Sequence, residues 1–278
     1  MKITTRIASL VSPFTLLFVT VLPMGCNTVE GSGRTQLNAY SITQEKQMGA
    51  DAYPEALKGA KLLTGGPQYE RGMRVAKRIQ QAAIERHPNP AADFEWQWVV
   101  IDDDQTVNAW AMPGGKCAIY TGIMKVATSD DELAVVLGHE AAHAIARHGG
   151  ERMTQEAGMN IGAQIAGAVG AAFGDPTGGT LSGEGTAALL HVTVGLPYSR
   201  KHETEADIIG LKIAAQAGYD PRTAPEFWNK MAASGGGGAP PEFLSTHPSD
   251  NTRAQTLQSV MPQAMEIYER SAKAPKSG

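Results

Sequence analysis

The chain has 278 residues, of which 42% are hydrophobic and 19% are charged, as in ordinary globular proteins. This length suits one large domain or two small ones. The formal net charge of −4 gives no basic field, which argues against nucleic acid as a partner. The function must therefore be sought in motifs rather than in overall charge.

The first 25 residues have the pattern of a secretory signal. Two basic residues precede an apolar run over 7–22, as is typical of such signals. The run is followed by Gly25 and Cys26, similar to a bacterial lipoprotein processing site, although Pro23 stands where an aliphatic residue is usual. We expect residues 1–25 to be removed and Cys26 to carry a lipid that attaches the chain to a membrane. A plain signal peptide or an uncleaved anchor is the alternative.

One domain is predicted after a short tether. Residues 26–41 contain the lipidated cysteine and a polar, glycine-rich stretch. Apolar residues at helical spacing then predict helices over 42–58 and 68–86, neither of which carries chemical groups at motif spacing. We interpret them as scaffold within a single domain over 42–272, with a tail at 273–278.

Three short strands are predicted before the main motif. They cover 94–101, 107–112 and 116–121, where β-branched and aromatic residues are frequent. A strand beside a peptidase site can pair with an extended substrate backbone, although a merely interior strand is the alternative. The predicted substrate strand comprises Asn108, Ala109, Trp110 and Ala111.

The strongest chemical signal is the sequence H-E-x-x-H at His139–His143. His139 and His143 are four residues apart, so on a helix both imidazoles project from one face and can bind one tetrahedral zinc ion. Glu140 projects beside them as a base for the attacking water. Residues 129–132 form a capping box, which places the motif on a helix. Two surface histidines on an amphipathic helix are the alternative.

A third ligand is expected some sixty residues later, where residues 199–207 open another helix. A catalytic zinc has three protein ligands and keeps its fourth position for water. Glu203 is preferred because Glu203 and Asp207 face one side of the helix, so that one can bind metal while the other accepts the spare N–H of a ligand histidine. His148 is rejected because it follows His143 by five residues rather than six. The other candidates are His191, His202, Glu205 and His247.

The remaining elements carry no further motif. The small-residue segment 157–174 is predicted as a buried or surface-packed helix, with a membrane span as the alternative. A glycine- and threonine-rich loop over 175–185 and a short helix over 186–196 follow. Helices over 224–233 and 251–271 complete the chain.

In this order, the motifs resemble the HtpX and CAAX-protease group of gluzincins, metallopeptidase family forty-eight. The resemblance rests on His139–His143, on Ser199-Arg200 with Glu203-Thr204-Glu205-Ala206-Asp207, on Asn108–Gly115, and on Thr246-His247-Pro248 with Arg253. The stretch Gly33–Leu37 resembles the bacterial lipoprotein branch of BepA- and LoiP-like proteins. The single-domain LoiP-like form fits better, because no helical repeat domain follows the last motif.

The resemblance implies roles for four residues beyond the motif helix. Glu203 would be the third ligand of one Zn²⁺ per chain, and Asp207 would contact the ligand histidines. His247 would be a regulatory fourth ligand on a loop, with an ordinary His-Pro turn as the alternative. Arg253 would either act catalytically on the transition state or anchor this loop.

We expect a mainly helical α+β fold, a zincin-like domain with a small mixed or antiparallel sheet beside the motif helix. The expected function is a zinc endopeptidase of the bacterial cell envelope that cleaves extended, unfolded or misassembled proteins. The expected location is the periplasmic face of the outer membrane, near outer-membrane assembly components, with a soluble periplasmic form as the alternative. A chaperone-like zinc lipoprotein with little turnover is the second hypothesis, and a cell-wall amidase is the third.

Overall fold

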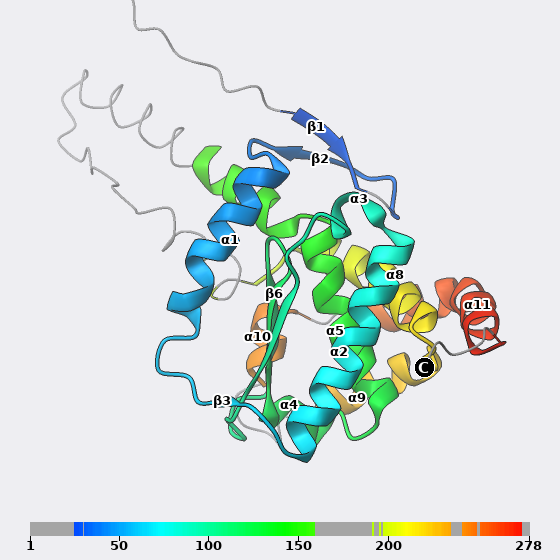
Figure 1. Ribbon diagram of the computed structural model, residues 1–278. Helices are drawn as coiled ribbons and strands as arrows, with labels where there is room; N and C mark the ends of the chain where they lie inside the picture. The colour runs from blue at the N-terminus through cyan, green and yellow to red at the C-terminus, as the bar shows by residue number, and fades with distance from the viewer. Residues whose placement is uncertain are drawn as a thin grey trace, which may run out of the picture.

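The computed structural model describes residues 25–158, 197–234, 241–248 and 251–273, except residue 30, together with residues 191 and 195. Most of the signal and nearly all of the segments predicted between 157 and 196 therefore lie outside the described residues. The described part joins one small hairpin, one sheet and a set of packed helices (Figure 1).

The N-terminal segment is a β-hairpin rather than the tether that its polar composition suggested. Strand β1 (Gly25–Thr28) pairs antiparallel with β2 (Thr35–Asn38). Between them, Val29 is buried in the main hydrophobic core, and Gly31 has a φ of 96°, a conformation that glycine adopts at little cost. Tertiary packing of Val29 thus orders a stretch with little local propensity of its own.

A four-stranded mixed sheet has the strand order β3-β4-β6-β5. The central strands β4 (Gln97–Ile101) and β6 (Lys116–Tyr120) are parallel. Strand β5 (Ala109–Met112) runs antiparallel to β6, and β3 (Leu62–Leu63) runs antiparallel to β4. Among the described residues β5 has no second partner, so it forms one edge of this sheet.

Helices make up most of the described chain and confirm the expected mainly helical α+β class. The helices are α1 (Ile42–Ala56), α2 (Pro67–Arg86), α3 (Pro88–Ala91), α4 (Thr121–Val126), α5 (Asp130–Ile145), α8 (Arg200–Gln216), α9 (Thr223–Ala233), α10 (Glu242–Thr246) and α11 (Asn251–Lys273). Within the described residues, the helices predicted over 42–58, 68–86, 224–233 and 251–271 and those of the two motif segments agree with the structure to within a few residues at their ends. The short helices α3, α4 and α10 and the helical stretch over 148–158 were not predicted, and the helices predicted over 157–174 and 186–196 fall almost entirely outside the described residues.

The closest helix packing brings α5 against α8. A Cβ atom on Gly138 would lie 2.6 Å from the carbonyl oxygen of Gly210, and one on Gly210 would lie 2.7 Å from the carbonyl carbon of Gly138. No larger residue fits at either position without moving a helix backbone. This contact immediately precedes His139, so it fixes how near α8 comes to the motif histidines.

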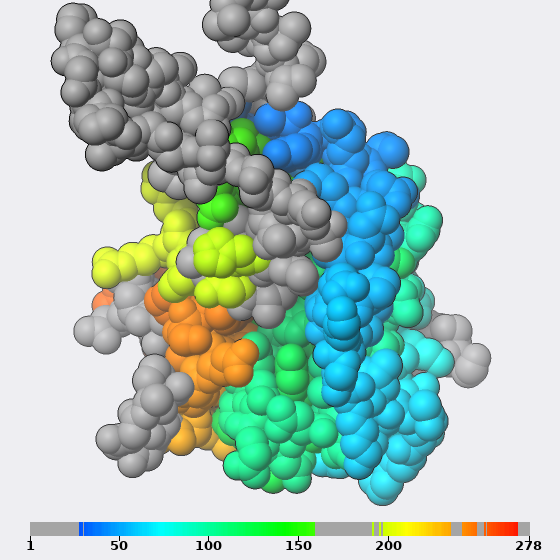
Figure 2. Space-filling view, turned by 90° about the vertical axis from the view of Figure 1, so that its left-hand side faces the viewer, coloured from blue at the N-terminus to red at the C-terminus, as the bar shows by residue number. Residues whose placement is uncertain are grey.

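The short helix α10 lies at the surface beside the β5 edge. The space-filling view shows its segment in orange next to the green segment that contains the sheet strands (Figure 2). The backbone N–H of Phe243 donates to the carbonyl of Val107, just before β5. The Asn108 side chain also donates to Glu242, at 3.2 Å. These contacts join α10 to the chain that enters β5.

Candidate active site

Helix α5 brings His139, Glu140 and His143 into the interior. The side chains of Ser129 and Glu132 form the predicted capping box, each accepting from the backbone N–H of the other. Every residue of α5 from Leu133 onward is buried. The Nε2 atoms of the two histidines are 3.0 Å apart, so both imidazoles point to one location.

Helix α8 places Glu203 opposite these histidines, in its first turn after the Ser199 cap. The Glu203 Oε2 atom is 3.4 Å from His139 Nε2, and Oε1 is 3.4 Å from His143 Nε2. Burial alone would raise the pKa of Glu203, but the facing His247 and hydrogen bonds with the two histidines hold that pKa well below its usual range. Glu203 is therefore an anion aimed at both imidazoles.

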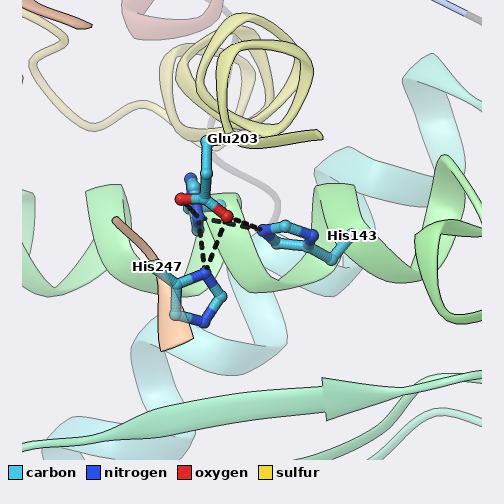
Figure 3. Close-up of side chains that lie close together, drawn as sticks. His143, Glu203 and His247 are labelled. Carbon is cyan, nitrogen blue, oxygen red and sulfur yellow. Dashed lines mark hydrogen bonds and ion pairs between the residues drawn. The ribbon is translucent and has the colours of Figure 1, made fainter. Parts of the chain in front are cut away.

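His247 completes a cluster of four buried side chains (Figure 3). One ligand atom from each of His139, His143, Glu203 and His247 lies within 4.8 Å of the other three. The Nδ1 atom of His247 is 3.1 Å from Glu203 Oε1 and 3.3 Å from His139 Nε2. The structure thus brings together the two motif histidines, the preferred third ligand and the residue of the C-terminal signature.

The geometry of this cluster fits a metal ion. Tetrahedral zinc with bonds of about 2.0–2.1 Å holds its ligand atoms about 3.3 Å from one another. Several of the observed separations, such as 3.3 Å between His139 Nε2 and His247 Nδ1, are close to that value. Glu203 Oε2 is buried, and among the described residues it faces His139 Nε2 at 3.4 Å and Arg253 Nη1 at 3.7 Å, both long contacts for a buried carboxylate oxygen that a bound metal ion would satisfy better.

Glu140 lies next to the cluster as a second buried carboxylate. Its Oε1 atom has no hydrogen-bond partner within the described part of the chain and is 3.5 Å from His247 Nε2. Burial raises the pKa of Glu140 to about 7, although the neighbouring His247 and the backbone N–H of Ala111 act in the opposite direction. A carboxylate with such a pKa can accept and return a proton near neutral pH.

Asp207 and Arg253 lie behind His139. The Oδ1 atom of Asp207 is 3.0 Å from His139 Nδ1, as expected for a residue that fixes the ring. Arg253 donates to both Asp207 oxygens, at 2.6 and 2.8 Å, and its guanidinium lies 3.8 Å from the centre of the Trp228 ring. These contacts tie Arg253 to Asp207 behind His139, and the choice between a catalytic role and anchoring of the His247 loop stays a prediction.

The predicted substrate strand coincides with β5 and the residue before it. Ala109 and Trp110 pair with Ile119 and Ala118 of β6, which leaves the other edge of β5 without a strand partner in the described structure. The Asn108 side chain is not directed at the cluster, since its amide donates to Glu242. Strand β5 therefore presents main-chain groups rather than a special side chain.

Sequence reasoning missed a second polar cluster behind His143. His148, set aside as a ligand, lies outside the four-residue cluster, with its Nδ1 atom 2.9 Å from His143 Nδ1. Its Nε2 atom is 2.9 Å from Glu205, and Glu205 in turn accepts a hydrogen bond from Arg34. The one available signal was the spacing of the acidic residues Glu203, Glu205 and Asp207. On a helix the first and third share a face, so Glu205 must face away from them and indicates a separate polar contact.

Cys26 lies within β1, where it is paired with Leu37. In the described part of the chain, no helix has both the length and the apolar character needed to span a bilayer. The alternative prediction of a membrane span over 157–174 falls almost entirely outside those residues.

The chain is similar to a known peptidase family and to several named proteases. The model of peptidase family M48 matches residues 70–261. The mitochondrial metalloendopeptidase OMA1 of Schizosaccharomyces pombe is 36% identical over 243 residues, which is 86% of this chain and 68% of that protein. The corresponding OMA1 of Arabidopsis thaliana is 40% identical over 187 residues, which is 66% of this chain and 36% of that protein. The beta-barrel assembly-enhancing protease of Escherichia coli K12 is 28% identical over 236 residues, which is 82% of this chain and 46% of that protein.

A buried H-E-x-x-H helix, a glutamate from a second helix and a small mixed sheet together define a zincin-like metallopeptidase domain. The family match and the relatives then make the classification specific: the chain belongs to peptidase family M48, a family of metal-dependent peptidases. The chain spans between 36% and 68% of the length of these relatives.

Proposed function

We propose that this protein is a zinc-dependent endopeptidase in which His139, His143 and Glu203 hold one zinc ion. The observation that carries the proposal is Glu140, whose buried Oε1 atom lies beside the ligand cluster without a hydrogen-bond partner in the described structure. A purely structural zinc site needs no carboxylate at that position.

The residues around the cluster divide the chemical work. Zinc, when bound, would polarise a water and the scissile carbonyl group. Glu140 takes the proton of the attacking water and returns it to the leaving amine. Asp207 accepts the Nδ1–H of His139, which keeps Nε2 available as a ligand, and Arg253 holds Asp207 in place.

The likeness of β5 to a substrate-binding edge supports a protein substrate in extended form. The backbone N–H of Ala111 reaches the Glu140 carboxylate, so the strand and the base are adjacent. Pairing with β5 would read main-chain groups and give weak side-chain selectivity. Unfolded or misassembled envelope proteins meet this requirement, which suggests a role in protein quality control.

His247 would regulate access to the site. It lies between Glu203 and Glu140, where a water and a substrate carbonyl would have to lie. The rings of Tyr198 and Phe243 stack on its imidazole, with centroids 5.3 and 4.4 Å away. With His247 as fourth ligand the site is closed, and α10 must move for catalysis. The contacts of α10 with the chain entering β5 would hold α10, and with it His247, against the substrate strand in the closed form.

For location, we propose the lipoprotein branch, with a signal over 1–25 and a lipid on Cys26, at the start of the hairpin that packs on the enzyme domain. The names of the relatives support two different compartments, since one is a beta-barrel assembly-enhancing protease and the others are mitochondrial. The Gly25-Cys26 sequence favours the periplasmic face of an outer membrane. Mass spectrometry of full-length protein expressed in a Gram-negative host should show a lipid on the wild type and none on Cys26→Ser.

Cleavage of casein by the purified mature chain tests the activity. We expect weak turnover by the wild type, strong turnover by His247→Ala, and none by Glu140→Gln at equal zinc content. Full activity of Glu140→Gln would contradict the mechanism. Zinc binding by all three proteins without cleavage of any unfolded substrate would favour the chaperone-like lipoprotein. A zinc site whose fourth coordination position is filled by His247 is compatible with that alternative too.

A further inference from the structure

The ring of His143 has two polar contacts that point in opposite directions. Its Nε2 atom faces the ligand cluster, and its Nδ1 atom is 2.9 Å from Nδ1 of His148. His148 is fully buried, with an exposed fraction of 0%. An imidazole placed there has no access to solvent and must find its partners within the protein.

The chain of contacts continues from His148 to the N-terminal hairpin. The Nε2 atom of His148 is 2.9 Å from Glu205 Oε2, and the Nε of Arg34 donates to that oxygen at 2.8 Å. The hydroxyl of Ser32 donates to the other oxygen of Glu205. Glu205 is therefore held by two residues of the hairpin loop, and it holds His148.

The protons in this chain have one consistent arrangement. If His143 binds metal through Nε2, its Nδ1 carries the proton and donates it. His148 must then accept with Nδ1, which leaves its own proton on Nε2 to donate to the Glu205 carboxylate. Every contact from His143 to Glu205 is satisfied with both histidines neutral and the carboxylate charged.

The hairpin is anchored to the helical core at several points, so its loop can hold Glu205 in a fixed position. Arg34 forms a two-point hydrogen-bonded pair with Glu151, at 2.9 and 2.7 Å. Val29 lies in the main hydrophobic core, and a Cβ atom on Gly31 would lie 2.7 Å from the ring of His87. The hairpin therefore packs against the helical core at several points rather than only at Arg34.

We propose that His148 is a positioning residue for His143, oriented by Glu205, and that the β1–β2 hairpin completes the metal site through Arg34. The inference rests on the proposed metal site and adds three residues to it. Its consequence is that zinc affinity depends on residues 25–38, although none of them is a ligand.

Metal affinity tests the proposal without relying on turnover. We would measure zinc affinity by competition with a chromophoric chelator, and ligand geometry from the visible absorption spectrum of the Co²⁺-substituted protein. His148→Leu should bind zinc about 10–100-fold more weakly, as removal of such supporting partners commonly does. His148→Asn keeps an acceptor near the Nδ1 position, so it should recover much of the affinity and the wild-type spectrum.

Two further variants extend the test along the chain. Glu205→Gln and Arg34→Ala should also weaken zinc binding, the latter less because it lies one step further away. Asp130→Asn is the matched control, because it removes a carboxylate that Arg71 and Arg74 bind at the start of helix α5. This carboxylate takes no part in the contacts that lead from His143 through His148 and Glu205 to Arg34. The control variant should lose stability but keep zinc affinity and the Co²⁺ spectrum.

The outcomes separate this inference from the peptidase proposal. Wild-type zinc affinity in both His148→Leu and Glu205→Gln would overturn the positioning role and leave the peptidase intact. Zinc binding without cleavage by both the wild type and His247→Ala would overturn the peptidase and leave the positioning role intact. If His148→Leu does not fold by circular dichroism, the comparison of His148→Asn and Glu205→Gln with Asp130→Asn decides, and equal affinity in all three would overturn the inference.

Discussion

The two motif histidines have the same proposed task but are supported by different parts of the molecule. His139 contacts a carboxylate directly, and Asp207 and Arg253 behind it belong to helices α8 and α11. His143 contacts another histidine, and its support runs through Glu205 to the N-terminal hairpin. One half of the site therefore depends on the helical core alone, and the other depends on a segment at the start of the chain.

Helix α8 serves both halves because its acidic side chains alternate. Glu203 and Asp207 face α5, whereas Glu205 is turned toward His148 and the hairpin. The close contact between Gly138 and Gly210 sets the distance at which all three act. Changes at this crossing should affect both histidines, while changes behind one histidine should affect mainly that one.

The largest effect is expected from Asp207→Ala. The substitution removes the carboxylate that accepts two hydrogen bonds from the buried Arg253. It also removes the acceptor for the Nδ1–H of His139. Breaking a buried charge pair costs about 3–5 kcal/mol, so the free energy of unfolding should fall by roughly that amount. Urea denaturation of the zinc-free protein measures it. A loss below about 1 kcal/mol would show that Asp207 does not hold Arg253 in the folded core.

A smaller effect that reaches both histidines is expected from Gly210→Ala. The added methyl group meets the backbone of Gly138, and overpacking of this kind costs about 1–3 kcal/mol. Gly158→Ala is the matched control, because a Cβ atom there meets nothing within 4 Å. Thermal unfolding and zinc titration of both variants check this. Equal zinc affinity in wild type and Gly210→Ala would mean that the crossing does not set the site.

The smallest effect concerns acid stability on the hairpin side. Burial would raise the pKa of Glu151, but hydrogen bonds from His202 and Arg34 lower it to about 2. Its ordinary pKa is near 4.5, so the stabilisation is present above that pH and is lost as pH falls toward 2. The difference in unfolding midpoint between wild type and Glu151→Gln should therefore shrink between pH 5 and pH 2. A constant difference over this range would remove Glu151 as an acid-sensitive anchor.

Local sequence patterns were sufficient for the two helices, α5 and α8, that carry His139, His143 and Glu203. The capping box at Ser129 and the four-residue spacings of His139 with His143 and of Glu203 with Asp207 act within single helices, and the structure has all of them. The hairpin could not be predicted, because the polar stretch that contains it is ordered by Val29 and Arg34 packing against distant helices. The link from His148 to Glu205 joins residues 57 positions apart, and no local spacing indicates it.

The central claim is that Glu140 acts as the base beside a metal site that His247 closes. The most direct test compares casein cleavage by His247→Ala with cleavage by the double variant His247→Ala/Glu140→Gln, each with one zinc per chain by elemental analysis. The account predicts rapid cleavage by the single variant and a loss of at least about a hundredfold in the double variant. Equal cleavage rates in the two proteins at equal zinc content would contradict it.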